Sequence, residues 1–97
     1  MKKNQREATM LAAIQRYGIP RQMAKVVEEC GELAAAVALN LADPDDATRL
    51  GLLDECADVQ IMLWQMRLMS TYINVNLEDR IEMKLDRLLD RMTQEMC

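Results

Sequence analysis

Two long stretches of helical periodicity meet at one short turn, and this feature constrains the fold more than any other. Residues 21–41 place their apolar side chains at intervals of three and four, on one stripe of a helix. Residues 44–70 predict a further helix, which follows after almost no loop. Asp43 is expected to cap this helix and Pro44 to occupy its first position. Because the connection is so short, the two helices must be antiparallel neighbours that form a helical hairpin.

Two more helical segments flank this hairpin. Residues 4–17 carry an apolar pattern that stops at Gly18, a residue suited to a left-handed cap. Residues 77–96 follow a connector over 70–75, with Asn76 as the expected cap. With only three glycines, two prolines and no Phe in 97 residues, the composition also favours helix. We therefore expect a single all-α domain over residues 1–97.

Charge and composition exclude several classes of protein. A net charge of −4 argues against a chain that coats a nucleic-acid polymer or an anionic membrane. No uncharged stretch exceeds ten residues, which is too short to cross a bilayer, and no apolar signal core follows the N-terminus. We therefore expect a cytoplasmic protein. Three cysteines without paired spacing and the absence of histidine argue against a zinc site and a disulfide framework.

Each helix of the hairpin carries two acidic residues one turn apart. These are Glu29 and Glu32 on the first helix, and Glu55 and Asp58 on the second. In an antiparallel hairpin, residues that face each other have numbers with the same sum. The numbers of Glu29 and Asp58 add to 87, and so do those of Glu32 and Glu55. Half of this sum falls between residues 43 and 44, which is where the turn is predicted. The four carboxylates should therefore meet at one level across the hairpin.

These acids interrupt a face that should be apolar. Glu55 and Asp58 share their side of the helix with Met62 and Met66. Like charges gathered in a half-buried place raise one another's pKa values, and a hard divalent cation relieves the repulsion. An all-oxygen ligand set without His points to Mg²⁺, with Mn²⁺ as a substitute. The alternative interpretation is that the acids form a solvated helix face, as most charge runs do.

The order and spacing of the acids resemble those of a known family. Glu28-Glu29-Cys30-Gly31-Glu32 matches an EExxE motif, and Glu55-Cys56-Ala57-Asp58 matches an ExxD motif after a spacer of 22 residues. This ordered pair of motifs is similar to that of the MazG-like all-α nucleoside triphosphate pyrophosphohydrolases. The resemblance covers residues 17–92.

The resemblance implies a four-helix bundle around the central hairpin, completed by assembly into a homodimer or a dimer of dimers. It also implies Mg²⁺-dependent hydrolysis of a nucleoside triphosphate to the monophosphate and pyrophosphate, with a metal-activated water attacking phosphorus. By position, Glu29, Glu32, Glu55 and Asp58 would be the metal ligands. Glu28 would be an additional catalytic acid beside Glu29, either binding a second ion or orienting the water.

The last predicted helix carries a row of basic residues, and the same resemblance assigns part of this row to the phosphates. Arg80, Lys84, Arg87 and Arg91 recur at helical spacing. The family pattern of a Lys followed by an Arg matches Lys84 with Arg87 or Arg91, and implies contacts to the β and γ phosphates. Lys25, one turn before the first acidic motif, is a weaker candidate for this role. The alternative is that these side chains are ordinary surface charges.

The second helix of the hairpin is apolar nearly all round over residues 61–69, which suggests a subunit interface. Trp64, Tyr17 and Tyr72 are the only aromatic residues that could stack on a base, and packing is their alternative role. A di-iron carboxylate bundle is excluded because it draws on Glu-x-x-His pairs. The competing function is a catalytically inactive MazG-like helical module that acts in protein–protein interaction. The sequence leaves the base and the sugar of a substrate open.

Overall fold

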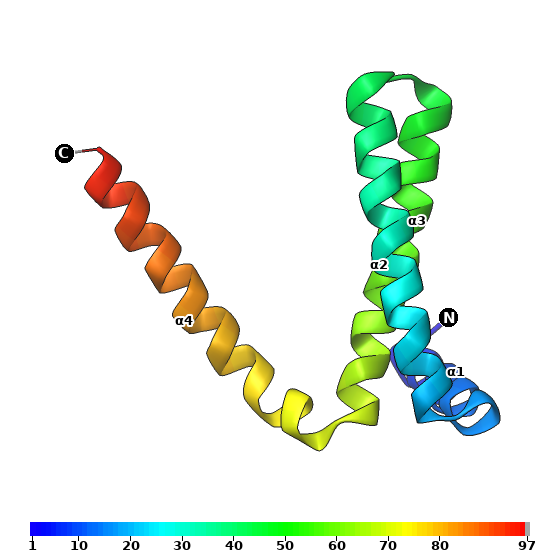
Figure 1. The fold of residues 1–97 in the computed structure, drawn as a ribbon. Helices are drawn as coiled ribbons and strands as arrows, with labels where there is room; N and C mark the ends of the chain where they lie inside the picture. Colours follow the sequence, from blue (N-terminus) through cyan, green and yellow to red (C-terminus); the bar gives the residue numbers. More distant parts are fainter. Residues whose placement is uncertain (97) are drawn as a thin grey trace.

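A computed structural model describes residues 1–96, and this part of the chain folds into helices with no strand. Figure 1 shows them in order: α1 (Lys3–Tyr17), α2 (Ile19–Ala42), α3 (Asp46–Met69) and α4 (Thr71–Glu95). The prediction of an all-α chain with four helices is therefore confirmed. None of the described helices is both long and apolar enough to cross a membrane.

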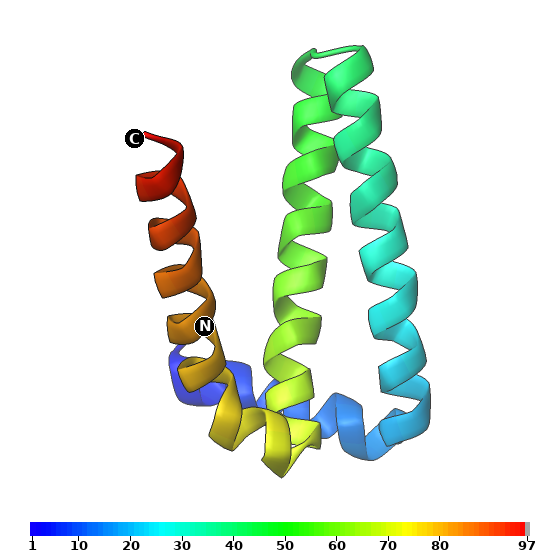
Figure 2. The same ribbon diagram turned by 60° about the vertical axis from the view of Figure 1, so that its left-hand side comes forward.

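Helices α2 and α3 form the predicted antiparallel hairpin, and they pack along their whole length (Figures 1 and 2). One buried hydrogen bond fixes their register: the side-chain Nε2 of Gln22 donates to Oε1 of Gln65 at 2.8 Å. These two residue numbers also add to 87. The structure thus confirms the register that the acidic motifs predict.

The turn of the hairpin differs in detail from the prediction. The cap of α3 is Asp45, whose carboxylate accepts a hydrogen bond from the Thr48 backbone N–H at 2.8 Å. The hydroxyl of Thr48 in turn donates to the backbone oxygen of Asp43 at 2.8 Å. Asp43 therefore contributes its carbonyl and does not cap α3, and Pro44 lies outside the helix. The helix begins at Asp46, two residues later than predicted. The reason is that the backbone N–H of Thr48 donates to the Asp45 carboxylate, which makes Asp45 the capping residue.

A single residue, Gly18, separates α1 from α2. Its φ of 87° lies in the region that glycine adopts without steric cost, and it lets the chain turn between two helices. Pro20 fits the first turn of α2, where a missing N–H costs nothing. α2 therefore begins at Ile19, two residues earlier than predicted. Figure 2 shows α1 lying across the open end of the hairpin, where it contacts both α2 and α3.

Helix α4 begins at Thr71, six residues earlier than predicted. The cap is Ser70, whose hydroxyl accepts a hydrogen bond from the Ile73 backbone N–H at 3.2 Å. The predicted connector over 70–75 is wrong, and Asn76 lies within the helix, donating to the backbone oxygen of Tyr72 at 2.8 Å. In Figure 1, α4 leaves the end of α3 and diverges from the hairpin. Among the described residues it contacts α3 but neither α1 nor α2.

The chain by itself buries little apolar surface. Met62 is the only buried hydrophobic residue in the described part, and the other buried residues are Gln22, Glu29 and Gln65. The accessible surface is 7778 Å², whereas a compact monomer of this mass exposes about 5,700 Å². The radius of gyration is 16.8 Å, against about 13 Å for a compact chain of this length. The four helices therefore do not close into a bundle within one chain.

Candidate metal centre

Three of the predicted acidic residues converge across the hairpin. Glu29 and Glu32 come from successive turns of α2, and Glu55 comes from the facing turn of α3. Each offers one carboxylate oxygen, and these three oxygens all lie within 4.8 Å of one another. We call Glu29, Glu32 and Glu55 the carboxylate cluster. Its geometry follows from the i, i+3 spacing on α2 and from the register of the hairpin.

Two members of the carboxylate cluster have oxygens that lack a partner. Glu29 is only 7% exposed, and its Oε1 lies 3.3 Å from the Lys25 ammonium. Its Oε2 and the Oε2 of Glu55 are sealed from solvent without a hydrogen bond. A buried carboxylate oxygen is costly unless a hydrogen bond, a charge or a metal satisfies it. A hard cation is a partner that such carboxylate oxygens can take, so the residues present fit Mg²⁺.

The electrostatics of the cluster show an excess of negative charge. The negative charge of Glu29 raises the pKa of the Glu32 carboxyl above its ordinary value of 4.5, and desolvation and Glu55 add to this effect. The hydrogen bond and the charge of Glu29 also raise the pKa of the Lys25 ammonium. One ammonium thus faces three carboxylates, and a divalent cation would restore the balance.

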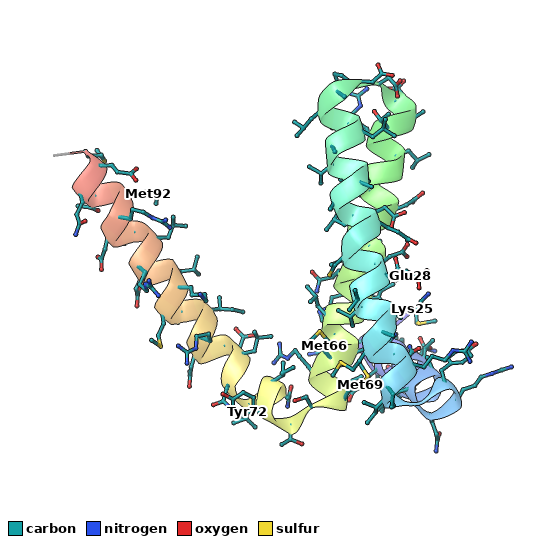
Figure 3. The ribbon with its side chains drawn as sticks, viewed as in Figure 1. Lys25, Glu28, Met66, Met69, Tyr72 and Met92 are labelled. Atoms are coloured by element: carbon teal, nitrogen blue, oxygen red, sulfur yellow. The ribbon has the colours of Figure 1, made fainter. Side chains whose placement is uncertain are left out.

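The two remaining predicted acids lie outside the carboxylate cluster. Asp58 is exposed; it does not belong to the group of three oxygens, although it lines a cavity together with Glu29. Glu28 is also exposed, and Figure 3 shows it beside Lys25 on the side of the hairpin that faces away from α4. The structure therefore brings together three of the four predicted ligands and leaves Asp58 and Glu28 at the edge of the site.

A cavity of about 210 Å³ adjoins the cluster where α1, α2 and α3 meet. A wider hollow of about 490 Å³ lies next to it and includes Arg21 and Lys25. Sequence reasoning did not single out Arg21, although it lies one turn before Lys25 on the same face of α2. It also missed Gln22 and Gln65 as site residues, although both are polar positions that obey the register of the hairpin. The polar residues that line the smaller cavity are Tyr17, Gln22, Lys25, Glu29, Asp58 and Gln65.

The basic residues assigned to the phosphates lie elsewhere in the chain. Lys84, Arg87 and Arg91 line a surface hollow of about 600 Å³ on α4. Because α4 contacts neither α1 nor α2 in the described part, this hollow is separate from the carboxylate cluster. Figure 3 shows Lys25 projecting from the hairpin on the side away from α4. Of the four predicted phosphate-binding residues, only Lys25 lies at the cluster within one chain.

The aromatic residues divide between the cavity and other surfaces. Tyr17 lines the cavity, and the guanidinium groups of Arg16 and Arg21 lie 5.7 Å and 5.5 Å from the centre of its ring. Trp64 lies in a separate groove between α1 and α3, with the guanidinium of Arg6 at 6.0 Å. Tyr72 is exposed at the start of α4 (Figure 3). Tyr17 is therefore the one aromatic residue placed to meet a ligand in the cavity beside the cluster.

No family model, no curated protein and no solved structure matches this chain. The carboxylate cluster and the motifs that form it are therefore the features that bear on function.

Proposed function

We propose that this protein is a Mg²⁺-dependent nucleoside triphosphate pyrophosphohydrolase of the MazG-like type. The observation that carries the proposal is the carboxylate cluster, in which Glu29 and Glu55 each hold a sealed oxygen without a partner. The ordered EExxE and ExxD motifs support it, since they supply the residues of the cluster. The reaction would take place in the cytoplasm on a free nucleotide, with no nucleic-acid polymer or membrane as partner.

The residues of the hairpin would have different roles at such a site. Glu29, Glu32 and Glu55 would hold the Mg²⁺ ion, for which Mn²⁺ could substitute, and Asp58 would approach it from the cavity. When bound, the ion neutralises phosphate charge and lowers the pKa of the water that attacks phosphorus. Glu28, with its exposed carboxylate next to Lys25, is assigned to orienting this water. Lys25 itself carries a positive charge to the edge of the cluster, where a phosphate tail would lie.

We further propose that a second copy of the chain completes the molecule. The surface in excess of a compact monomer is roughly 2,000 Å² per chain, or about 4,000 Å² for two chains, which lies in the range that obligate dimers bury in total. In a dimer, α4 of one copy can pack on the hairpin of the other and bring Lys84, Arg87 and Arg91 toward its phosphates. A dimer or a dimer of dimers would satisfy this requirement. The exposed apolar row available for the contact on α4 consists of Ile81, Leu85, Leu88 and Met92.

The activity can be tested with a panel of canonical and damaged ribo- and deoxyribonucleoside triphosphates in the presence of Mg²⁺. We expect release of the monophosphate and pyrophosphate, and release of orthophosphate alone would contradict the assigned bond cleavage. Glu32→Gln and Asp58→Asn should each abolish turnover and leave the helical circular dichroism intact. Asp54→Asn, an exposed acid on the same helix outside the cluster, is the matched control and should retain activity. Full activity in both site variants would remove the metal assignment.

A second candidate function is supported by the exposed apolar row of α4. A MazG-like helical module without turnover could use this row to bind another protein. This alternative predicts no nucleotide hydrolysis with any member of the panel. It also predicts that Mg²⁺ leaves the melting temperature unchanged, because a module of this kind has no use for the ion.

A further inference from the structure

Two glutamines form a buried amide pair beside the carboxylate cluster. Gln22 and Gln65 are 4% and 5% exposed, and a single hydrogen bond of 2.8 Å joins Nε2 of Gln22 to Oε1 of Gln65. A side-chain amide carries one acceptor oxygen and two donor hydrogens, so one bond leaves much of the pair's capacity unused. Buried polar groups normally find partners. The unused groups of this pair therefore need an explanation.

The unused groups of the pair remain accessible to solvent. Within the described part of the chain, Oε1 of Gln22 and Nε2 of Gln65 make no other hydrogen bond, and neither is sealed from solvent. Both residues line the cavity of about 210 Å³. The pair therefore offers this cavity one acceptor and one donor side by side, held in place by the bond between the two helices. Such an arrangement suits a ligand that presents a donor next to an acceptor.

The size and walls of the cavity narrow the class of ligand. Pockets that enclose drug-sized molecules measure roughly 300–1,000 Å³, so a cavity of about 210 Å³ suits one small ring. Tyr17 supplies an aromatic wall, and aromatic side chains are common stacking partners of unpaired bases. Glu29 and Asp58 line the same cavity, so a ring bound there would remain next to the carboxylate cluster.

We infer that this cavity binds the base of a pyrimidine nucleotide, and that Gln22 and Gln65 recognise the donor and acceptor groups on its edge. The inference rests on the proposed function for the choice of a nucleotide, because the cluster would hold the phosphates. Pyrimidine bases have a single ring and carry donor and acceptor groups in one plane. A purine has two fused rings, so the single ring of a pyrimidine is the closer match to a cavity below the usual size range.

Calorimetric titration with Mg²⁺ present tests the inference without turnover. The probes are uridine, cytidine and adenosine 5′-monophosphates, with ribose 5-phosphate as the ligand that lacks a base. We expect the better of the two pyrimidine nucleotides to bind at least about tenfold tighter than ribose 5-phosphate, because two hydrogen bonds to a base contribute about that factor. Adenosine monophosphate should bind more weakly than the better pyrimidine nucleotide, because its base matches the cavity less closely.

Substitution of the amides should remove this preference. Gln65→Leu should bring the pyrimidine nucleotides to within about twofold of ribose 5-phosphate, and Gln22→Met should do the same from the other helix. Gln65→Asn, which withdraws the amide but keeps a polar side chain, serves if either apolar variant fails to fold. Gln60→Leu is the matched control, since Gln60 is an exposed glutamine on α3 outside this cavity, and it should keep the preference of the unmodified protein.

The outcomes separate this inference from the proposed function. If the unmodified protein shows no preference for pyrimidines, or if the preference survives all three substitutions at Gln22 and Gln65, the inference is overturned and the pair serves only the register of the hairpin. Selective binding without hydrolysis of the triphosphates would support the inference and contradict the proposed function. Hydrolysis of the triphosphates at equal rates for all bases would support the proposed function and contradict the inference.

Discussion

Replacing Glu55 by Gln should make the metal-free protein more stable, which is unusual for a change at a partly buried position. Glu55 and Glu29 offer carboxylate oxygens within 4.8 Å of each other, and each has a sealed oxygen without a hydrogen bond. In the absence of a cation, these two groups repel each other across the hairpin. Gln keeps the shape of Glu, removes one negative charge and adds donor hydrogens to a site rich in acceptors.

The size of the effect follows from Coulomb's law. Two unit charges 4.8 Å apart repel by about 0.9 kcal/mol in water, and by about 3.5 kcal/mol at the effective dielectric constant of 20 that suits protein sites. Glu55 is only half-buried, so solvent screening keeps the repulsion near the lower value. We expect Glu55→Gln to stabilise the metal-free protein by about 1 kcal/mol. For a domain of this size, that gain raises the melting temperature by about 4–8 °C.

Addition of Mg²⁺ should make the unmodified protein more stable than the Glu55→Gln variant. At a concentration one hundred times its dissociation constant, a ligand stabilises the folded state by about 2.7 kcal/mol. The unmodified protein should gain this amount, whereas Glu55→Gln, which lacks a ligand, should gain much less. Thermal denaturation at low salt, fixed protein concentration and pH 8, with and without Mg²⁺, measures both effects. Asp54→Asn, which removes an exposed charge one residue away, should respond to Mg²⁺ as the unmodified protein does.

One pattern of results would refute this reasoning. If Glu55→Gln lowers the melting temperature of the metal-free protein, the carboxylate has favourable partners and does not suffer repulsion. If Mg²⁺ then leaves the unmodified protein unchanged, the cluster is not a cation site.

Three further predictions follow from the pKa values, the caps and the exposed helix. The folded protein holds the Glu32 proton more tightly than the unfolded chain does, because folding raises the pKa of this carboxyl above 4.5. The stability of the metal-free protein should therefore fall as the pH rises from 4.5 through the raised pKa. Glu32→Gln should flatten this dependence in thermal denaturation between about pH 4.5 and 7. Asp45→Ala removes the cap of α3 and should cost about 1 kcal/mol in chemical denaturation, whereas Asp43→Ala should cost much less, since only its backbone oxygen is used. Leu85→Asp with Leu88→Asp should convert the proposed dimer to monomer in analytical ultracentrifugation, and Asp86→Asn on the opposite face of α4 should leave the dimer intact.

The hairpin and its register could be predicted because they depend on local rules that the sequence states directly. Helical periodicity located α2 and α3, and the shortness of the turn required them to be antiparallel. The sum of residue numbers places Glu32 opposite Glu55, and it places Gln22 opposite Gln65 by the same rule. Each of these inferences uses only the spacing of residues along a helix.

The predicted starts of α3 and α4 were wrong because several polar side chains compete to cap each helix. The residue that caps is the one whose side chain accepts a hydrogen bond from a backbone N–H of the first turn. Asp43, Asp45 and Asp46 all suit a cap, and the position of Thr48 decides among them. Ser70 and Asn76 compete in the same way for the start of α4, and the earlier cap prevails because it adds six residues of helix. The path of α4 away from the hairpin has no local signal at all, since its apolar row is compatible with packing on its own chain or on another.

The isolation of α4 would also make the folding of the proposed dimer depend on protein concentration. A helix of 25 residues that touches its chain only near its start has little tertiary packing to stabilise it, and packing provides most of the stability of helices in proteins. On dilution below the dissociation constant of a dimer, we would expect α4 to fray from its C-terminal end while α1, α2 and α3 remain helical. Roughly a quarter of the helical ellipticity would then depend on the protein concentration.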